Sequence, residues 1–235
     1  MLNSLAVFAA AAGLVAAPAA APAAAVTFDA FTTFDGTQNA GNFVYGYSDF
    51  TSGTLFGATG PCAIAGSVCL QEFGIADVPG VYKSTTTSFQ YGTVNVPNDR
   101  LLVHPGPNAG DPGVFIAFVA PTAGSYSVSA NFSVLDTNPT GVNLTYAVIN
   151  GGVPTLLGAG ALTNVGNIFN FNDTRLLAAN DVLVVVVDRA GNYSNDSTGV
   201  NFAVTLVPEP ATWALMIGGF AMTGFAARRR RIVAA

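Results

Sequence analysis

The chain has 235 residues, of which 51% are hydrophobic and only 9% are charged. This composition excludes an intrinsically disordered chain, which combines low hydrophobicity with high net charge. The basic residues include Arg228–Arg231, so residues 26–207 carry four basic against twelve acidic side chains. Such a body repels phosphate backbones, and we expect no nucleic-acid partner. One histidine and two cysteines also argue against a zinc site of the usual Cys/His kind.

Residues 1–25 have the features of a signal peptide. An uncharged apolar run, Leu5–Ala17, is followed by two prolines and by the small residues Ala23–Ala25. No lysine or arginine precedes the apolar run, which departs from the usual pattern. We predict cleavage by signal peptidase before Val26; an Ala-rich helical anchor is the alternative. Export follows from either interpretation.

Residues 26–207 are predicted to form an all-β domain. Apolar and polar residues alternate with a period of two over 126–134, 142–148 and 200–206, as in strands with one buried face. The continuous apolar run Val182–Val187 predicts a central strand that is covered on both sides. Further candidate strands are Thr27–Phe34, Asn42–Tyr47, Ser88–Val96, Arg100–His104, Gly113–Ala120 and Val165–Phe171. About ten short strands, with a loop-rich segment over 48–80, predict a two-sheet sandwich of the jelly-roll kind.

The cysteines, Cys62 and Cys69, lie seven positions apart in a glycine-containing loop. In the oxidising compartment that export implies, we expect them to form a disulfide. A redox-active pair usually has two intervening residues, so catalysis is the less favoured interpretation.

The single histidine, His104, has no partner at a catalytic spacing that the sequence reveals. The favoured interpretation is a strand-end histidine that hydrogen-bonds to a neighbouring loop, and a general base or ligand is the alternative. Several tyrosines offer rings to a sugar, although most aromatic residues of a sandwich lie in the core. They are Tyr45, Tyr47, Tyr82, Tyr91 and Tyr193.

Asp188, Asn192, Asn195 and Asp196 gather in one loop. Carboxylates and amides at such spacing could coordinate a structural Ca²⁺, with Asp188, Asn192 and Asp196 as the ligands, although the spacing differs from that of an EF-hand. Ordinary turn chemistry is the favoured alternative. We expect no other cofactor.

The C-terminal residues 208–235 contain a candidate transmembrane helix. Residues 211–227 are uncharged, roughly 25 Å of helix at 1.5 Å per residue, which is short for a membrane but usable. Trp213 would lie at the outer interface, and Arg228, Arg229, Arg230 and Arg231 would hold the C-terminus on the cytoplasmic side. A buried core helix is the alternative, but it leaves the arginines unexplained.

This segment resembles the PEP-CTERM sorting signal of Gram-negative bacteria, in its PEPxxWA form. The resemblance rests on Pro208, Glu209 and Pro210, on Trp213 and Ala214, and on the apolar span and arginine cluster that follow. It implies an exported precursor that is held at the inner membrane and then cut by an exosortase near Pro208–Pro210. Such proteins are usually destined for the cell surface or an extracellular matrix.

The body resembles a jelly-roll module of exported bacterial proteins. The resemblance rests on the order of short elements between residues 42 and 206, with Phe43-Val44 standing where that module has Trp-Ser. The elements are 42–47, 79–84, 101–107, 120–126, 176–182 and 191–199. The module is known by its architecture, so the resemblance implies a fold rather than an activity.

Three functions follow in order of preference. The first is a cell-surface or matrix protein without catalytic activity, associated with exopolysaccharide or biofilm. The second is a carbohydrate-binding jelly roll, which is compatible with the first. The third is a hydrolase or lyase on the same scaffold, since one fold hosts many activities.

Overall fold

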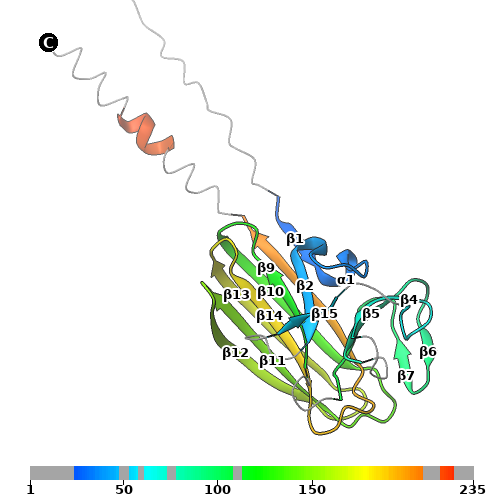
Figure 1. Ribbon diagram of the computed structural model, residues 1–235. Helices are drawn as coiled ribbons and strands as arrows, with labels where there is room; N and C mark the ends of the chain where they lie inside the picture. The colour runs from blue at the N-terminus through cyan, green and yellow to red at the C-terminus, as the bar shows by residue number, and fades with distance from the viewer. Residues whose placement is uncertain are drawn as a thin grey trace, which may run out of the picture. The chain divides into compact units, whose positions relative to one another are not determined.

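The computed structural model describes residues 24–47, 53–57, 61–72, 78–107, 113–208 and 218–224. Residues Ala25–Val207 form one compact unit. The first unit is a jelly-roll-like sandwich of two antiparallel sheets (Figure 1). The predicted all-β, two-sheet architecture is confirmed.

The first sheet contains seven of the described strands. Its order is β13-β10-β15-β8-β5-β4, and β1 also pairs with β15. These strands are β1 (Val26–Asp29), β4 (Ser67–Gln71), β5 (Gly80–Ser84), β8 (Leu101–His104), β10 (Gly124–Val134), β13 (Ile168–Leu177) and β15 (Thr198–Val207).

The second sheet contains six described strands, in the order β12-β11-β14-β9-β2-β3. They are β2 (Phe43–Tyr47), β3 (Thr54–Leu55), β9 (Val114–Val119), β11 (Val142–Asn150), β12 (Val153–Leu162) and β14 (Val182–Arg189). A separate hairpin joins β6 (Phe89–Tyr91) to β7 (Val94–Val96).

The alternating segments are strands, and their apolar sides form the core between the sheets. On β10, Tyr126 and Phe132 are completely buried, whereas Ser127 and Ser129 lie on the exposed side. The outer side is polar across strands as well, since the Nδ2 of Asn131 donates to the Oδ1 of Asn170 at 2.6 Å.

The strand β14 is buried on both faces, as predicted from its continuous apolar run. Val185 and its alternate neighbours belong to the core between the sheets. Val184 and Val186 belong to a separate cluster with Phe115 and Ala147 on the other face. Because neither face meets water, the strand carries no polar alternation.

The predicted strand Thr27–Phe34 is too long. Only Val26–Asp29 is extended, and Ala30–Thr33 forms the helical turn α1. The turn begins there because the Oδ1 of Asp29 accepts the Thr32 N–H at 2.7 Å, which is an N-cap. The turn ends at Thr33. The Nζ of Lys83 donates to the carbonyl of the next residue, Phe34, at 3.0 Å.

Two further segments differ from the predicted elements. Ser88–Val96 is a hairpin rather than one strand, because Gly92 takes the left-handed conformation (φ 58°) that reverses the chain. The segment 48–80, predicted to be loop-rich, includes β3 and β4 among its described residues.

Strand β12 was missing from the predicted elements, and β13 runs from Ile168 to Leu177 where 165–171 was expected. Pro154, Gly158 and Gly160 interrupt the apolar pattern of β12. Gly158 and Gly160 leave no room for a side chain, because aromatic rings from β13 pack directly against their backbone. A Cβ on Gly158 would be 2.9 Å from Phe171, and one on Gly160 would be 2.5 Å from Phe169.

We predict that Gly160→Val destabilises the sandwich by about 1–3 kcal/mol, because the new side chain must displace the Phe169 ring from the end of the core. Ala159→Val is the control, since residue 159 is the exposed neighbour on the same strand. Equilibrium urea unfolding measures both variants. Equal midpoints for the two would contradict this account of β12.

Candidate functional site

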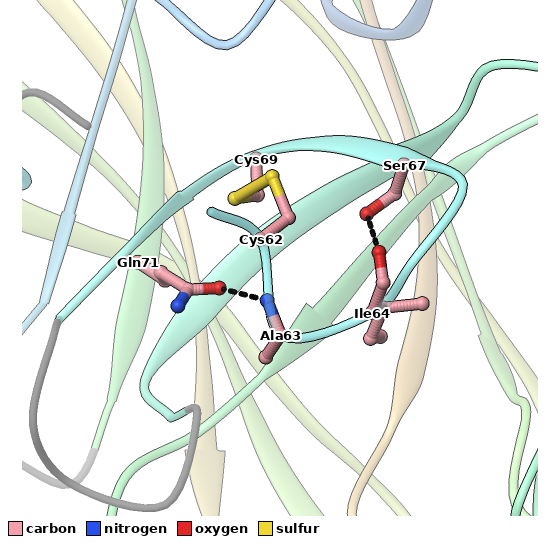
Figure 2. Close-up of a disulfide and its surroundings, with 6 residues drawn as sticks. All are labelled: Cys62, Ala63, Ile64, Ser67, Cys69 and Gln71. Carbon is pink, nitrogen blue, oxygen red and sulfur yellow. Dashed lines mark hydrogen bonds between the residues drawn. A yellow bond between two sulfur atoms is a disulfide. The ribbon is translucent and has the colours of Figure 1, made fainter. Parts of the chain in front are cut away.

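The predicted disulfide is present: Cys62 and Cys69 are joined, with their Cα atoms 5.7 Å apart. It closes the loop that leads into β4 (Figure 2). Inside the loop, the Ser67 hydroxyl donates to the Ile64 carbonyl at 2.6 Å, and the Ala63 N–H donates to the Oε1 of Gln71 at 3.1 Å. The cross-link and these two hydrogen bonds together stabilise the conformation of this loop.

The start of the disulfide loop and the β6–β7 hairpin pack on the face of the first sheet that points away from the main core, and we call them the hairpin lobe (residues 61–66 and 89–96). A second, smaller core joins this lobe to the sheet. Ile64 and Val96 of the lobe pack there with Tyr82 of β5 and Leu102 of β8, all of them buried. The lobe therefore covers one part of a sheet face that is exposed and polar elsewhere.

A cleft of about 170 Å³ lies beside the hairpin lobe. It has aromatic walls and several polar groups, the usual composition of a small-molecule site. Its lining includes Tyr82, Tyr91, Thr93, His104, Asp136, Asn195 and Ser197.

Asp136, which is 2% exposed and lines this cleft, is hydrogen-bonded to two segments that are distant from it in sequence. One carboxylate oxygen accepts the Thr93 hydroxyl at 2.7 Å, and the other accepts the Ser197 N–H at 2.8 Å. Both oxygens are thus satisfied by the lobe and by the segment before β15. Sequence reasoning missed Thr93 and Asp136, because no motif marks either residue.

His104 ends strand β8 and lines the cleft. Its Nδ1 lies 2.8 Å from the Pro105 carbonyl and must donate to it, since a carbonyl only accepts. This bond to the following loop agrees with the favoured sequence interpretation. Burial lowers the pKa of His104, while the Pro105 bond and the charge of Asp136 oppose that effect. The ring is therefore neutral at pH 7.

We predict that the free energy of unfolding falls as the pH drops below about 6.5, the ordinary histidine pKa. There the unfolded chain takes up a proton that the folded His104 refuses, so the unfolded state gains stability. The slope for one proton is at most about 1.4 kcal/mol per pH unit. Urea unfolding from pH 8 to pH 5.5 should show this loss in the wild type and not in His104→Gln; parallel curves would refute the assignment.

The structure brings together two of the three predicted calcium ligands, Asn192 and Asp196. Asn192 and Asp196 both lie against the Thr140 hydroxyl, at 3.2 Å and 2.7 Å from their Oδ1 atoms. Asp188 belongs to β14, where its Oδ1 is buried without a hydrogen-bond partner and burial raises its pKa. Over the described ranges, no group of three or more His, Cys, Asp and Glu side chains could hold a metal.

The tyrosines proposed to bind a sugar have different environments. Tyr45 and Tyr82 are buried, and Tyr91 is 42% exposed at the cleft. Tyr193 packs edge-on to His104, with 6.4 Å between ring centroids. Of the predicted set, Tyr91 is therefore the ring that combines exposure with a place in the cleft.

Most of the predicted sorting signal lies outside the described residues, namely Glu209, Pro210, Trp213, Arg228, Arg229, Arg230 and Arg231. Pro208 is described, and residues 218–224 of the predicted span 211–227 are helical. Within the part of the chain that the structure covers, no helix has the length and hydropathy needed to cross a membrane.

Residues 206–231 match the PEP-CTERM protein-sorting motif. This match agrees with the resemblance drawn from Pro208–Pro210, Trp213 and the arginines. It indicates a protein that is exported as a membrane-anchored precursor and recognised by an exosortase. No curated protein matches the chain.

Solved structures to which the chain is similar include murine APRIL (13% identity, 54% of this chain and 88% of that one, TM-score 0.30). A family 35 carbohydrate-binding module from Clostridium thermocellum has 13% identity over 51% of this chain and 83% of that one (TM-score 0.29). The CBM22-1–GH10 portion of a C. thermocellum xylanase, complexed with xylohexaose, has 8% identity over 46% of this chain (TM-score 0.32). The match covers 21% of that xylanase chain.

Proposed function

We propose that this chain is a precursor from which an exosortase releases the β-sandwich to the cell surface or an extracellular matrix, where it associates with exopolysaccharide or biofilm and has no catalytic activity of its own. The observation that carries the proposal is the position of the sorting motif. The match begins at residue 206, where the last strand, β15, is ending at Val207.

A cut near Pro208–Pro210 would leave the sandwich whole. Strand β15 pairs with β1, β8 and β10, and every one of these pairs ends at or before Val207. The main core likewise consists of residues that precede the motif. In this scheme signal peptidase removes residues 1–25, and the arginines keep the precursor in the inner membrane, because moving four charges through hydrocarbon is costly.

We predict that Glu209→Ala, or deletion of Arg228–Arg231, leaves an uncut precursor or misroutes it, while the sandwich folds normally. Asp99→Ala is the control, since it removes an exposed carboxylate far from the motif in sequence. Immunoblots of membrane and external fractions, probed with an antibody to the sandwich, give the readout. External wild-type protein that still carries Trp213 and the arginines would rule out processing.

The cleft beside the hairpin lobe favours a second function, binding of a saccharide. The Tyr91 ring offers an exposed apolar surface, and Thr93, Asn195 and His104 offer polar groups around it. The cleft volume is below the roughly 300–1,000 Å³ of sites for drug-sized ligands, so it suits about one sugar ring. At neutral pH the uncharged histidine also suits an uncharged ligand.

We predict that the wild type binds at least one polysaccharide or oligosaccharide on a glycan array and that Tyr91→Ala weakens this binding at least tenfold, because it removes the exposed ring from the cleft. Leu176→Ala is the control, since Leu176 is also exposed (82%) but lies on β13, outside the cleft lining. Equal losses in both variants, or binding to no glycan, would exclude this site.

A further inference from the structure

Strand β12 is an edge strand, since among the described strands it pairs with β11 alone. It lies on the same side of the sandwich as β13, the edge strand of the first sheet (Figure 1). We call this side the β12–β13 edge (residues 153–177). Each of its strands has ten residues, whereas β3 and β4, at the opposite ends of the two sheets, have two and five. Because short strands are one way in which proteins limit the pairing of exposed backbone groups, the β12–β13 edge lacks that protection.

The most exposed large hydrophobic side chains of the sandwich also lie on this edge. Over the described part of Ala25–Val207, four such side chains are 39–49% exposed and lie elsewhere. The other five are 61–82% exposed and all belong to the β12–β13 edge, namely Val153, Leu156, Val165, Ile168 and Leu176. Single exposed apolar residues are ordinary on a protein surface, but several on one side of a molecule mark an interaction surface.

The β12–β13 edge has no net charge, unlike the rest of the sandwich. Its charged residues are one acid and one base, Asp173 and Arg175, and they form an ion pair. The remainder of residues 26–207 carries three basic against eleven acidic side chains. Two copies of this acidic protein repel each other through their charged faces, and the uncharged edge adds no such repulsion. Charge complementarity therefore favours a second copy over a strongly charged partner.

The β12–β13 edge is also large enough for a stable contact between two copies. A strand of ten residues is about 33 Å long, and two sheets about 10 Å apart, with side chains on their outer faces, give a width of roughly 20 Å. Two copies in contact along this edge would bury on the order of 1,300 Å² in total, within the range of about 1,200–2,000 Å² for specific interfaces.

We propose that the β12–β13 edge binds a second copy of this chain, with β12 pairing antiparallel to the same strand of the partner about a two-fold axis. In a two-fold contact the same surface serves both copies, and opposite ends of the two edges meet. Val165 and Ile168 lie at the end where the connecting turn is, and Val153 and Leu176 lie at the other end. The apolar side chains at each end therefore meet apolar side chains of the partner.

The backbone pairing is expected over Gly158–Leu162. There β12 pairs residue for residue with β11, whereas Leu157 has no partner on β11 and Pro154 lacks an N–H. Strand β13 instead carries the charges of Asp173 and Arg175, and charged residues at an edge oppose pairing. The inference goes beyond the proposed function and does not depend on it, because no residue of the edge belongs to the sorting motif or to the cleft lining.

Sedimentation velocity of the full chain in detergent, over a range of concentrations, tests the proposal. The wild type should show a monomer–dimer equilibrium with a dissociation constant in the micromolar range. Ala161→Lys should raise this constant at least tenfold, since it places like charges of the two copies beside the paired strands. Gln90→Lys is the control, because Gln90 is also an exposed strand residue but lies on β6. Circular dichroism verifies folding, and Leu156→Lys replaces Ala161→Lys should that variant fail to fold.

Cysteine cross-linking then locates the contact on the sandwich. A short bismaleimide should link two copies of an Ala161→Cys variant, because Ala161 is exposed on β12. It should not link Leu55→Cys, which lies on β3 at the opposite edge of the same sheet. Three results overturn the proposal: a wild type that stays monomeric at roughly 100 µM, equal dimer formation by the wild type and the folded lysine variant, or equal cross-linking of the two cysteine variants.

Discussion

The sandwich depends on a cluster of aromatic rings that meet between the two sheets. The Phe118 ring, on β9 of the second sheet, lies 5.0 Å from Phe28 and 5.8 Å from Tyr126 of the first sheet. Phe43, next to it on β2, lies 5.6 Å from Phe202 on β15. Large rings bury more apolar area than any other side chain and hold fixed mutual geometries, so these contacts set both the spacing and the register of the sheets. A slip of one residue in any of these strands would move its ring to the opposite face of the sheet.

The cleft lies on the outside of this sandwich and is formed largely by loops and short strands. The hairpin lobe packs on the first sheet through the second, smaller core, and the disulfide joins it to β4. Asp136 then connects the lobe to the segment before β15 through Thr93 and Ser197. One buried carboxylate, with a hydrogen bond to each of its oxygens, therefore links the two segments directly. The cleft lies next to these hydrogen bonds, since Thr93, Asp136 and Ser197 all line it.

The segment before β15 makes two kinds of contact with residues that are distant in sequence. Asn195 and Ser197 line the cleft, and the Oδ1 of Asp196, between them, accepts the Thr140 hydroxyl at 2.7 Å; β15 begins at Thr198. Strand β15 lies between β10 and β8 in the first sheet and ends at Val207, where the match to the sorting motif has just begun. The folded part of the protein and its sorting signal therefore meet without a long linker. Processing there is compatible with a sandwich whose hydrogen bonds are already complete.

By itself the sequence determined the features that are encoded locally. Period-two alternation marked β10, β11 and β15, an apolar run marked the doubly covered β14, and a short ordered motif marked the sorting signal. The disulfide followed from two cysteines and the expected compartment. Only the tertiary structure decided β12, because Gly158 and Gly160 owe their place in a strand to rings from β13. It also decided the cleft and the convergence on Thr140, because antiparallel pairing across more than fifty residues brings these groups together, and no local pattern records a distant partner.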